Sequence, residues 1–339
     1  MTKSDRLQKA LRDATQDLYD IEPWRGLLRF SGLGVCVVAL VWLAWRRDSL
    51  AELLSWTVLA GIVYTFWLIC SHDAAHRTLT GWRGFDEISV RLMSWPVMWP
   101  VGVYSELHRL HHSWNGRDLR DPERVQWTRE EYDRASPWLR WYVRHQWLID
   151  VLLLGGIGII LKTLIRGVQL RSVSPRLTRQ LLLDIGGMVA VQGSLLTWVV
   201  LTHQSVWHYG LFWLVLERTI GVMMQTRDHL EHYGLWRCGE SHLVNQLYGS
   251  RNLSVLPGFG WLLGGLQYHA VHHGFPGIPC YRLETAFQRV QAVLVEQGCE
   301  PMAVGDGYVR EIWRLGLHPA VIDSGGETVR SIPVVSGVV

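Results

Sequence analysis

The chain has 339 residues, of which 48% are apolar and 11% aromatic, so it can bury a large core as one membrane domain or about two soluble ones. Its formal net charge of +3 is small and no long basic run is present, which argues against nucleic acid as a partner. The five cysteines are scattered without a CxxC pair, which is typical of reduced thiols and not of a disulfide framework.

The first ~25 residues are polar, so they are not a signal peptide. Beyond them, five stretches are apolar enough to be considered as membrane spans, each of which needs about 20 mostly apolar residues. These stretches cover about 27–45, 51–70, 147–165, 181–201 and 208–225. The sequence also contains 19 tryptophans, a residue that favours membrane–water interfaces.

Charge decides which stretches we expect to cross. Cytoplasmic loops carry an excess of Lys and Arg, and a crossing at 147–165 would put four arginines between 166 and 179 into a short outer loop. We therefore predict that 147–165, which contains three glycines, is a membrane-surface or re-entrant helix. The apolar stretch 88–104 is interpreted in the same way, because Pro96 and Pro100 break it.

The remaining four stretches give a topology of two helical hairpins. The predicted spans are 27–45, 51–70, 181–201 and 208–225, and they form a membrane domain over 27–290. Residues 1–26 and the tail 291–339 are predicted to be cytosolic, so both termini lie on the cytoplasmic side. Only two basic residues, Arg46 and Arg47, then fall in the outer turns 46–50 and 202–207.

Most of the 15 histidines are clustered, and each cluster follows a recurrent spacing. The clusters are His72-Asp-Ala-Ala-His76, His108-Arg-Leu-His111-His112 and His269-Ala-Val-His272-His273, with a further segment Arg227-Asp-His229-Leu-Glu231-His232-Tyr-Gly234. Residues three or four apart share a face of a helix, so each cluster places imidazoles side by side. Under the four-span topology all the clusters lie on the inner side.

Imidazole in its neutral form binds iron, zinc and copper. Eight histidines from the three boxes and one from the 229–232 segment exceed what a single metal can bind, so the pattern predicts two metals. An imidazole-rich two-metal site on a membrane scaffold favours oxygen activation and attack on an unactivated C–H bond. A zinc hydrolase usually uses three protein ligands, and a metal transporter should carry its histidines inside the spans, so both classes are disfavoured.

The order of these boxes resembles that of the membrane fatty-acid desaturase superfamily over about residues 50–290. The second box is followed by Asp121-Pro122, the 227–234 segment resembles R-x-x-x-E-H-x-G, and the third box is followed by a segment similar to F-P-x-x-P-x-Y-x-L. No haem-binding HPGG segment and no NYxQHYG motif of alkane hydroxylases occurs in the sequence.

The resemblance implies an all-α integral membrane protein with four transmembrane helices in two hairpins below a cytosolic helical cap that holds a di-iron site. Carried over residue by residue, the iron ligands are His72, His76, His108, His111, His112, His232, His269, His272 and His273. His229 matches no ligand position. Asp73 and Glu231 lie beside ligands and are expected to orient them through hydrogen bonds.

The implied reaction is the O2-dependent desaturation of an acyl chain, with electrons from an external carrier such as ferredoxin or cytochrome b5. Hydroxylation, ketolation and oxidative decarboxylation of a lipid-like chain use the same scaffold and remain alternatives. The chain length, the carrier of the acyl group and the oxidised carbon are left open by the sequence.

Overall fold

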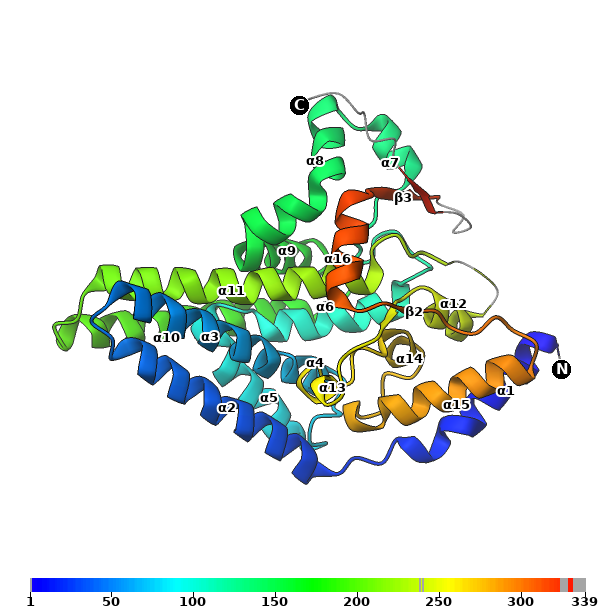
Figure 1. Ribbon diagram of the computed structural model, residues 1–339, viewed down its shortest axis with the longest axis horizontal. Helices are drawn as coiled ribbons and strands as arrows, with labels where there is room; N and C mark the ends of the chain where they lie inside the picture. Colours follow the sequence, from blue (N-terminus) through cyan, green and yellow to red (C-terminus); the bar gives the residue numbers. More distant parts are fainter. Residues whose placement is uncertain (1, 238, 240, 324–328, 332–339) are drawn as a thin grey trace. The chain divides into compact units, whose positions relative to one another are not determined.

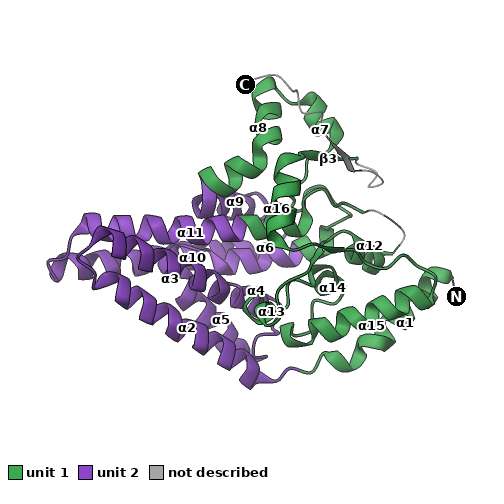
Figure 2. Ribbon diagram, viewed as in Figure 1, with its two compact units in different colours: residues 1–20, 111–153, 226–339 green, residues 21–110, 154–225 purple. Residues whose placement is uncertain are grey.

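The computed structural model describes residues 2–237, 239, 241–323 and 329–331 (Figure 1). Most of these residues are helical, which confirms the predicted all-α class, and the chain divides into two compact units (Figure 2). Unit 1 comprises residues 1–20, 111–153 and 226–339, and unit 2 comprises 21–110 and 154–225. Helices α6 (Val101–Trp114) and α11 (Val206–His232) each begin in unit 2 and end in unit 1.

Unit 2 contains both predicted hairpins. Besides parts of α6 and α11, it contains α2 (Pro23–Trp45), α3 (Leu50–Leu68), α4 (Cys70–Ala75), α5 (Arg83–Ser94), the 3-10 turn η2 (Trp95–Val97), α9 (Gly155–Gln169) and α10 (Arg176–Leu201). Helices α2 and α3 pack along each other. Helices α10 and α11 are linked by the Tyr209 hydroxyl, which donates to Gln192 Oε1 at 2.6 Å.

Glycines allow the helices of unit 2 to approach closely. A Cβ added at Gly221 of α11 would lie 1.8 Å from the backbone nitrogen of Gly156 in α9. A Cβ added at Gly61 of α3 would lie 2.7 Å from the Cβ of Thr219 in α11. Both distances are shorter than any real contact, so a side chain at either position would force the helices apart.

Four helices among the described residues are long and apolar enough to cross a membrane. They are Pro23–Trp45, Leu50–Ala75, Pro137–Gln169 and Arg176–Leu201. Three of them contain the predicted spans 27–45, 51–70 and 181–201. The fourth differs from the prediction, because it includes 147–165, whereas α11, which contains the predicted span 208–225, is not among the four.

The stretch Pro137–Gln169 is not one regular α-helix. Helix α8 (Pro137–Leu148) continues into the π-helical segment η3 (Ile149–Leu154), and α9 starts at Gly155, whose φ is +53°. A positive φ interrupts the right-handed helix, and the remaining 15 residues of α9 fall short of the about 20 that a span needs. The assignment of the fourth span to 208–225 stays a prediction.

The two carboxylates within the predicted spans 181–201 and 208–225 are buried, as their cost in lipid requires. Asp184 is fully buried and accepts hydrogen bonds from Trp95 Nε1 at 3.1 Å and the Val103 N–H at 2.9 Å. Glu217 is 3% exposed and accepts from the Ile157 N–H and from the guanidinium of Arg218. These partners support a structural role for both carboxylates.

Unit 1 consists of shorter helices and two strand pairs. It contains α1 (Lys3–Thr15), η1 (Gln16–Leu18), α7 (Arg129–Arg134), α8, α12 (His242–Tyr248), α13 (Phe259–Leu262), α14 (His269–Gly274), η4 (Cys280–Arg282), α15 (Leu283–Glu296) and α16 (Tyr308–Leu317). Strands β1 (Asn252–Leu253) and β2 (Val304–Gly305) pair in parallel, and β3 (Ala320–Ile322) and β4 (Val329–Ser331) pair antiparallel. Helices α12 and α14 pack together, as do α1 and α15.

The predicted boundary between a membrane domain and a tail at residue 291 falls inside α15. Leu283, Ala286, Val290 and Leu294 are buried at helical spacing, so the apolar stripe continues through that boundary. Residues that follow, such as Met302, are buried in the same unit. The chain is therefore folded into unit 1 through residue 323, and residues 324–328 and 332–339 of the predicted tail lie outside the described residues.

Candidate metal centre

Helix α6 carries the second histidine box near its carboxyl end. His108 lies in unit 2, and His111 and His112 lie in unit 1. The spacing of three and four residues puts these imidazoles on adjacent positions of one continuous helix, as the sequence pattern predicted. All three side chains are buried, which is unusual for histidine outside a site with specific partners.

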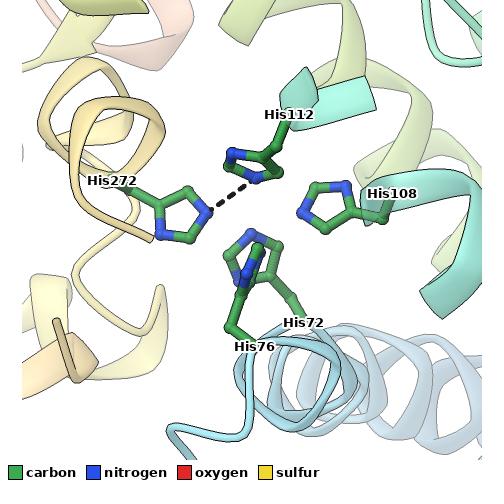
Figure 3. A group of neighbouring side chains, drawn as sticks. All are labelled: His72, His76, His108, His112 and His272. Atoms are coloured by element: carbon green, nitrogen blue, oxygen red, sulfur yellow. Dashed lines mark hydrogen bonds between the residues drawn. The ribbon is translucent and has the colours of Figure 1, made fainter. Parts of the chain in front are cut away.

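In unit 2, the first box and His108 form a group of three imidazoles. The ring centres of His72, His76 and His108 are 4.8–5.0 Å apart, and each ring offers a nitrogen within 4.8 Å of the others. Figure 3 shows the three rings turned toward one another. Tyr104 stacks on His108 with ring centres 5.1 Å apart, which fixes the plane of that imidazole.

The carboxylate of Asp73 lies beside His72 of the first box. Its Oδ2 lies 2.8 Å from Arg29 Nη1, and its Oδ1 lies 3.5 Å from His72 Nδ1. The carboxylate is 3% exposed, so the interpretation of Asp73 as a solvated surface group is excluded. The closer partner is Arg29 of α2, which the sequence motifs did not single out.

In unit 1, a second group brings together residues from α6, α11 and α14. His111 Nε2 lies 3.2 Å from His232 Nε2, and His269 Nε2 lies 3.0 Å from His232 Nε2 and 3.1 Å from His273 Nε2. The Nε2 atoms of His112 and His272 lie 3.2 Å apart, as the dashed line in Figure 3 shows. Thus the same ring nitrogen of each of these six histidines turns toward a neighbouring imidazole.

Hydrogen bonds at the other ring nitrogen select the tautomer. Both carboxylate oxygens of Asp121 lie 2.8 Å from His111 Nδ1, and Gln246 Oε1 lies 2.8 Å from His273 Nδ1. An acceptor at Nδ1 keeps the proton there and leaves the Nε2 lone pair directed into the group. Lone pairs that face each other in a buried site repel unless a cation lies between them, so this donor set fits a metal.

The electrostatics of the group depend on burial and on nearby carboxylates. Burial and the neighbouring imidazoles hold the pKa values of His269 and His273 well below the ordinary value, so both rings are neutral and ready to bind a metal. Burial alone would lower the pKa of His111, but the carboxylates of Asp121 and Glu123 raise it to about 9. Burial raises the pKa of Glu231 to about 8.

Glu231, the residue before His232, is also buried. Its Oε1 lies 3.0 Å from Arg227 Nε, and its Oε2 lies 3.5 Å from His269 Nε2. The exposed fraction of 2% excludes a solvated carboxylate at this position. The contact to His269 is made at Nε2 and not at Nδ1, where an orienting partner would bind.

His229 occupies a separate environment within unit 1. Its Nε2 lies 3.2 Å from Asp150 Oδ2, and its ring packs against those of Trp147 and Tyr233. It is 1% exposed and does not belong to any of the candidate metal groups among the described residues. His229 is therefore a buried residue paired with Asp150 and not a surface group.

Several supporting residues could not be found from motifs. Gln246 and Asp150 lie in segments without a histidine box, and His242 Nε2 lies 3.2 Å from the backbone oxygen of His112. Asp121 belongs to the Asp-Pro pair that follows the second box, and this position in the sequence was the signal that could have identified it as a supporting residue. His145, which lies outside the histidine boxes, is exposed, and its Nδ1 lies 2.7 Å from the Trp141 carbonyl oxygen.

Unit 2 contains a polar cavity of about 500 Å³ beside the first group of imidazoles. His76 and His108 line one part of it. The charged residues in its wall are Arg77, Arg83, Arg91, Arg109, Arg176, Arg179, Asp86, Glu87 and Glu106. A second, smaller cavity in the same unit has a mainly apolar wall that includes Leu68, Trp99, Ile160 and Met224.

A helical scaffold with long apolar helices and buried groups of imidazoles is typical of a membrane protein that binds metal ions. Residues 49–303 match the family model described as Fatty acid desaturase. The chain is also 25% identical over 294 residues to a protein named probable fatty acid desaturase DES1 from Sorghum bicolor, with 84% of this chain and 74% of that protein covered.

The chain belongs to the fatty acid desaturase family, which confirms the resemblance derived from the histidine boxes. Together with the four apolar helices, this membership identifies an integral membrane protein of desaturase type, and thus an oxidoreductase.

Proposed function

We propose that this protein is an O2-dependent di-iron acyl desaturase. The observation that carries the proposal is that the imidazole Nε2 atoms in unit 1 face one another. Asp121 and Gln246 contact the opposite ring nitrogen, Nδ1, of His111 and His273. In the proposed reaction, two adjacent carbons of the acyl chain each lose a hydrogen. Two electrons from an external carrier and two protons complete the reduction of O2 to two molecules of water.

Nine histidines are the proposed iron ligands. They are His72, His76, His108, His111, His112, His232, His269, His272 and His273. Neutral imidazole suits iron, and the number of rings exceeds the needs of one ion. Iron bound there would supply the activation of O2 and the cleavage of unactivated C–H bonds.

The chain's own residues orient the proposed ligands and bury most of them. The carboxylate of Asp121 keeps the proton on His111 Nδ1, and the amide oxygen of Gln246 does the same for His273. Eight of the nine ligands are less than 10% exposed, whereas His76 is half-buried and lines the polar cavity together with His108. Water is therefore excluded mainly from the imidazoles of unit 1. Exclusion of water protects reactive species from side reactions.

The two cavities of unit 2 differ in polarity, as do the two parts of an acyl substrate. The apolar cavity, with Trp99 and Met224 in its wall, has a volume of about 30 Å³ and admits only a short piece of alkyl chain. In the polar cavity, six arginines outnumber three carboxylates, which favours an anionic polar end. Arginine forms paired hydrogen bonds with phosphate, so the substrate we propose carries its acyl group on a phosphate-bearing lipid or thioester.

The remaining parts of the proposal concern the surroundings of the enzyme. The electron donor that we propose is an external carrier such as ferredoxin or cytochrome b5. Both termini and the histidine boxes lie on the cytoplasmic side, because the basic residues are concentrated in those segments.

Metal and product analysis test this function. The purified protein should contain two irons per chain, and cells that express it should convert a supplied acyl chain into one that is two mass units lighter. A gain of one oxygen would show a hydroxylase or ketolase, and a terminal alkene would show a decarboxylating oxidase. Zinc as the only metal, with no oxidised product, would refute the proposal.

Two matched variants connect the metal to the histidine boxes. His232→Ala should lower iron content and activity together, because its Nε2 lies among the Nε2 atoms of His111 and His269. His229→Ala, three residues away, should keep about two irons per chain, since its ring contacts Asp150 instead. The reverse result would show that the ligand assignment is out of register in α11.

A further inference from the structure

The position of Glu231 differs from the positions of Asp121 and Gln246, two polar groups that hold imidazoles of unit 1. Asp121 and Gln246 contact Nδ1 of their histidines, which is the nitrogen that faces away from the neighbouring rings. Glu231 Oε2 instead lies 3.5 Å from His269 Nε2, the nitrogen that faces into the group. A carboxylate placed on that side cannot act by holding the ligand's far proton.

The same Nε2 of His269 is the meeting point of several donor atoms. It lies 3.0 Å from His232 Nε2 and 3.1 Å from His273 Nε2. One oxygen of Glu231 and one nitrogen each of His232 and His269 all lie within 4.8 Å of one another, close enough to surround one ion. The carboxylate oxygen is therefore one of the donor atoms and does not stand behind them.

Arg227 determines which oxygen of Glu231 is available. Its Nε lies 3.0 Å from Oε1, one helical turn earlier on α11, and this ion pair is almost completely buried. Oε2 is the oxygen directed to the imidazoles. The arrangement positions the carboxylate to bind a metal through a single oxygen while the other remains paired with the guanidinium.

We propose that Glu231 is itself an iron ligand through Oε2, so that one of the two metal positions in this chain is a mixed carboxylate–imidazole site. The inference rests on the proposed function, because it requires that these histidines bind iron. Two histidines and one carboxylate form the donor set typical of iron(II) centres that activate O2. The carboxylate would also add an oxygen donor to a ligand set that otherwise consists of imidazole nitrogens.

The direct test is a structure of the iron-loaded, full-length protein by cryo-electron microscopy. The distance from Glu231 Oε2 to the nearer iron should be about 2.2 Å, the usual length of a metal–carboxylate bond. A separation that leaves room for a water molecule would overturn the proposal. This measurement uses the unaltered protein, so it does not depend on the folding of any variant.

Variants provide an independent readout in the metal spectrum. Glu231→Gln should change the ⁵⁷Fe Mössbauer parameters of one of the two irons and lower its affinity about 10-fold or more, whereas Glu231→Asp should restore part of both. Glu131→Gln is the control, because Glu131 is also paired with an arginine, Arg124 at 2.7 Å, but contacts none of the boxes. An unchanged spectrum and iron content in Glu231→Gln would overturn the proposal.

The results of these experiments distinguish the ligand role of Glu231 from the proposed desaturase function. If the wild-type protein binds two irons and desaturates an acyl chain while Glu231→Gln keeps both spectra, the ligand role is refuted and the desaturase function stands. If the wild-type protein binds no iron, both proposals fall.

Discussion

Replacement of Asp121 should weaken iron binding without disturbing the membrane helices. Both carboxylate oxygens of Asp121 lie 2.8 Å from His111 Nδ1, and the side chain is 1% exposed. In Asp121→Asn the amide oxygen can still accept from Nδ1–H, and the Glu123 N–H keeps an acceptor at this position. What is lost is the charge, so the hydrogen bond becomes a neutral one of roughly half the strength.

The size of the effect follows from the role of such partners. Loss of a group that orients a metal-binding histidine typically lowers metal affinity by about 10–100-fold, which corresponds to about 1.4–2.8 kcal/mol. Asp121→Asn should lie near the lower value, because a weaker hydrogen bond remains. Asp121→Ala should lie near the upper value, because it also leaves the buried Nδ1–H without an acceptor, at a cost of about 1–3 kcal/mol.

Competition between the protein and a chelator for iron tests this prediction. Iron retained per chain would be determined by elemental analysis across a series of chelator concentrations for the wild type and both variants. Asp118→Asn is the matched control, because Asp118 lies in the same loop but pairs with the exposed Arg120. Equal iron retention in Asp121→Ala and in Asp118→Asn would show that Asp121 does not support a metal ligand and would refute the reasoning.

Three further predictions concern topology, substrate and packing. Reporter fusions at Ser49 and at the carboxyl terminus should lie on opposite sides of the membrane; the same side for both would refute the four-span topology. The double variant Arg176→Gln/Arg179→Gln should raise KM for a phosphate-bearing acyl substrate about 10-fold with kcat little changed, because both residues line the polar cavity. An unchanged KM would show that this cavity does not bind the substrate. Gly221→Ala should lower the melting temperature, because the added methyl group overpacks against Gly156 at a cost of about 1–3 kcal/mol. Gly210→Ala should not, because nothing lies within 4 Å of the added Cβ, and equal melting temperatures for the two variants would refute the close helix contact.

The grouping of the proposed metal ligands was the most predictable part of the molecule. Spacings of three and four residues on a helix bring imidazoles together through local geometry alone, so His108, His111 and His112 could be grouped before any tertiary structure was known. The partners of those rings could not be predicted in this way. Gln246 reaches His273 across 27 residues of chain, and that contact depends on the packing of α12 against α14.

The fold was predictable where composition alone determines the element. The spans 27–45, 51–70 and 181–201 lie within long apolar helices, and the turns between the paired helices fall where they were expected. The choice between 147–165 and 208–225 could not be made from hydropathy, since the first contains flexible glycines and the second contains Glu217 and Arg218. The prediction of a tail from residue 291 reflects the low average hydropathy of α15, because a helix with a single apolar stripe does not stand out from a polar segment.

The buried pair formed by Arg29 and Asp73 links the first apolar helix directly to the residue beside His72. Helix α2 is therefore part of the support of the first histidine box as well as an anchor in lipid. A shortened protein that begins after residue 29 would leave the Asp73 carboxylate buried without its guanidinium, at a cost of several kcal/mol. Choices made in preparing the protein, such as the position of an amino-terminal cleavage site or a detergent that loosens α2 from α3, will consequently affect how much metal the purified material retains.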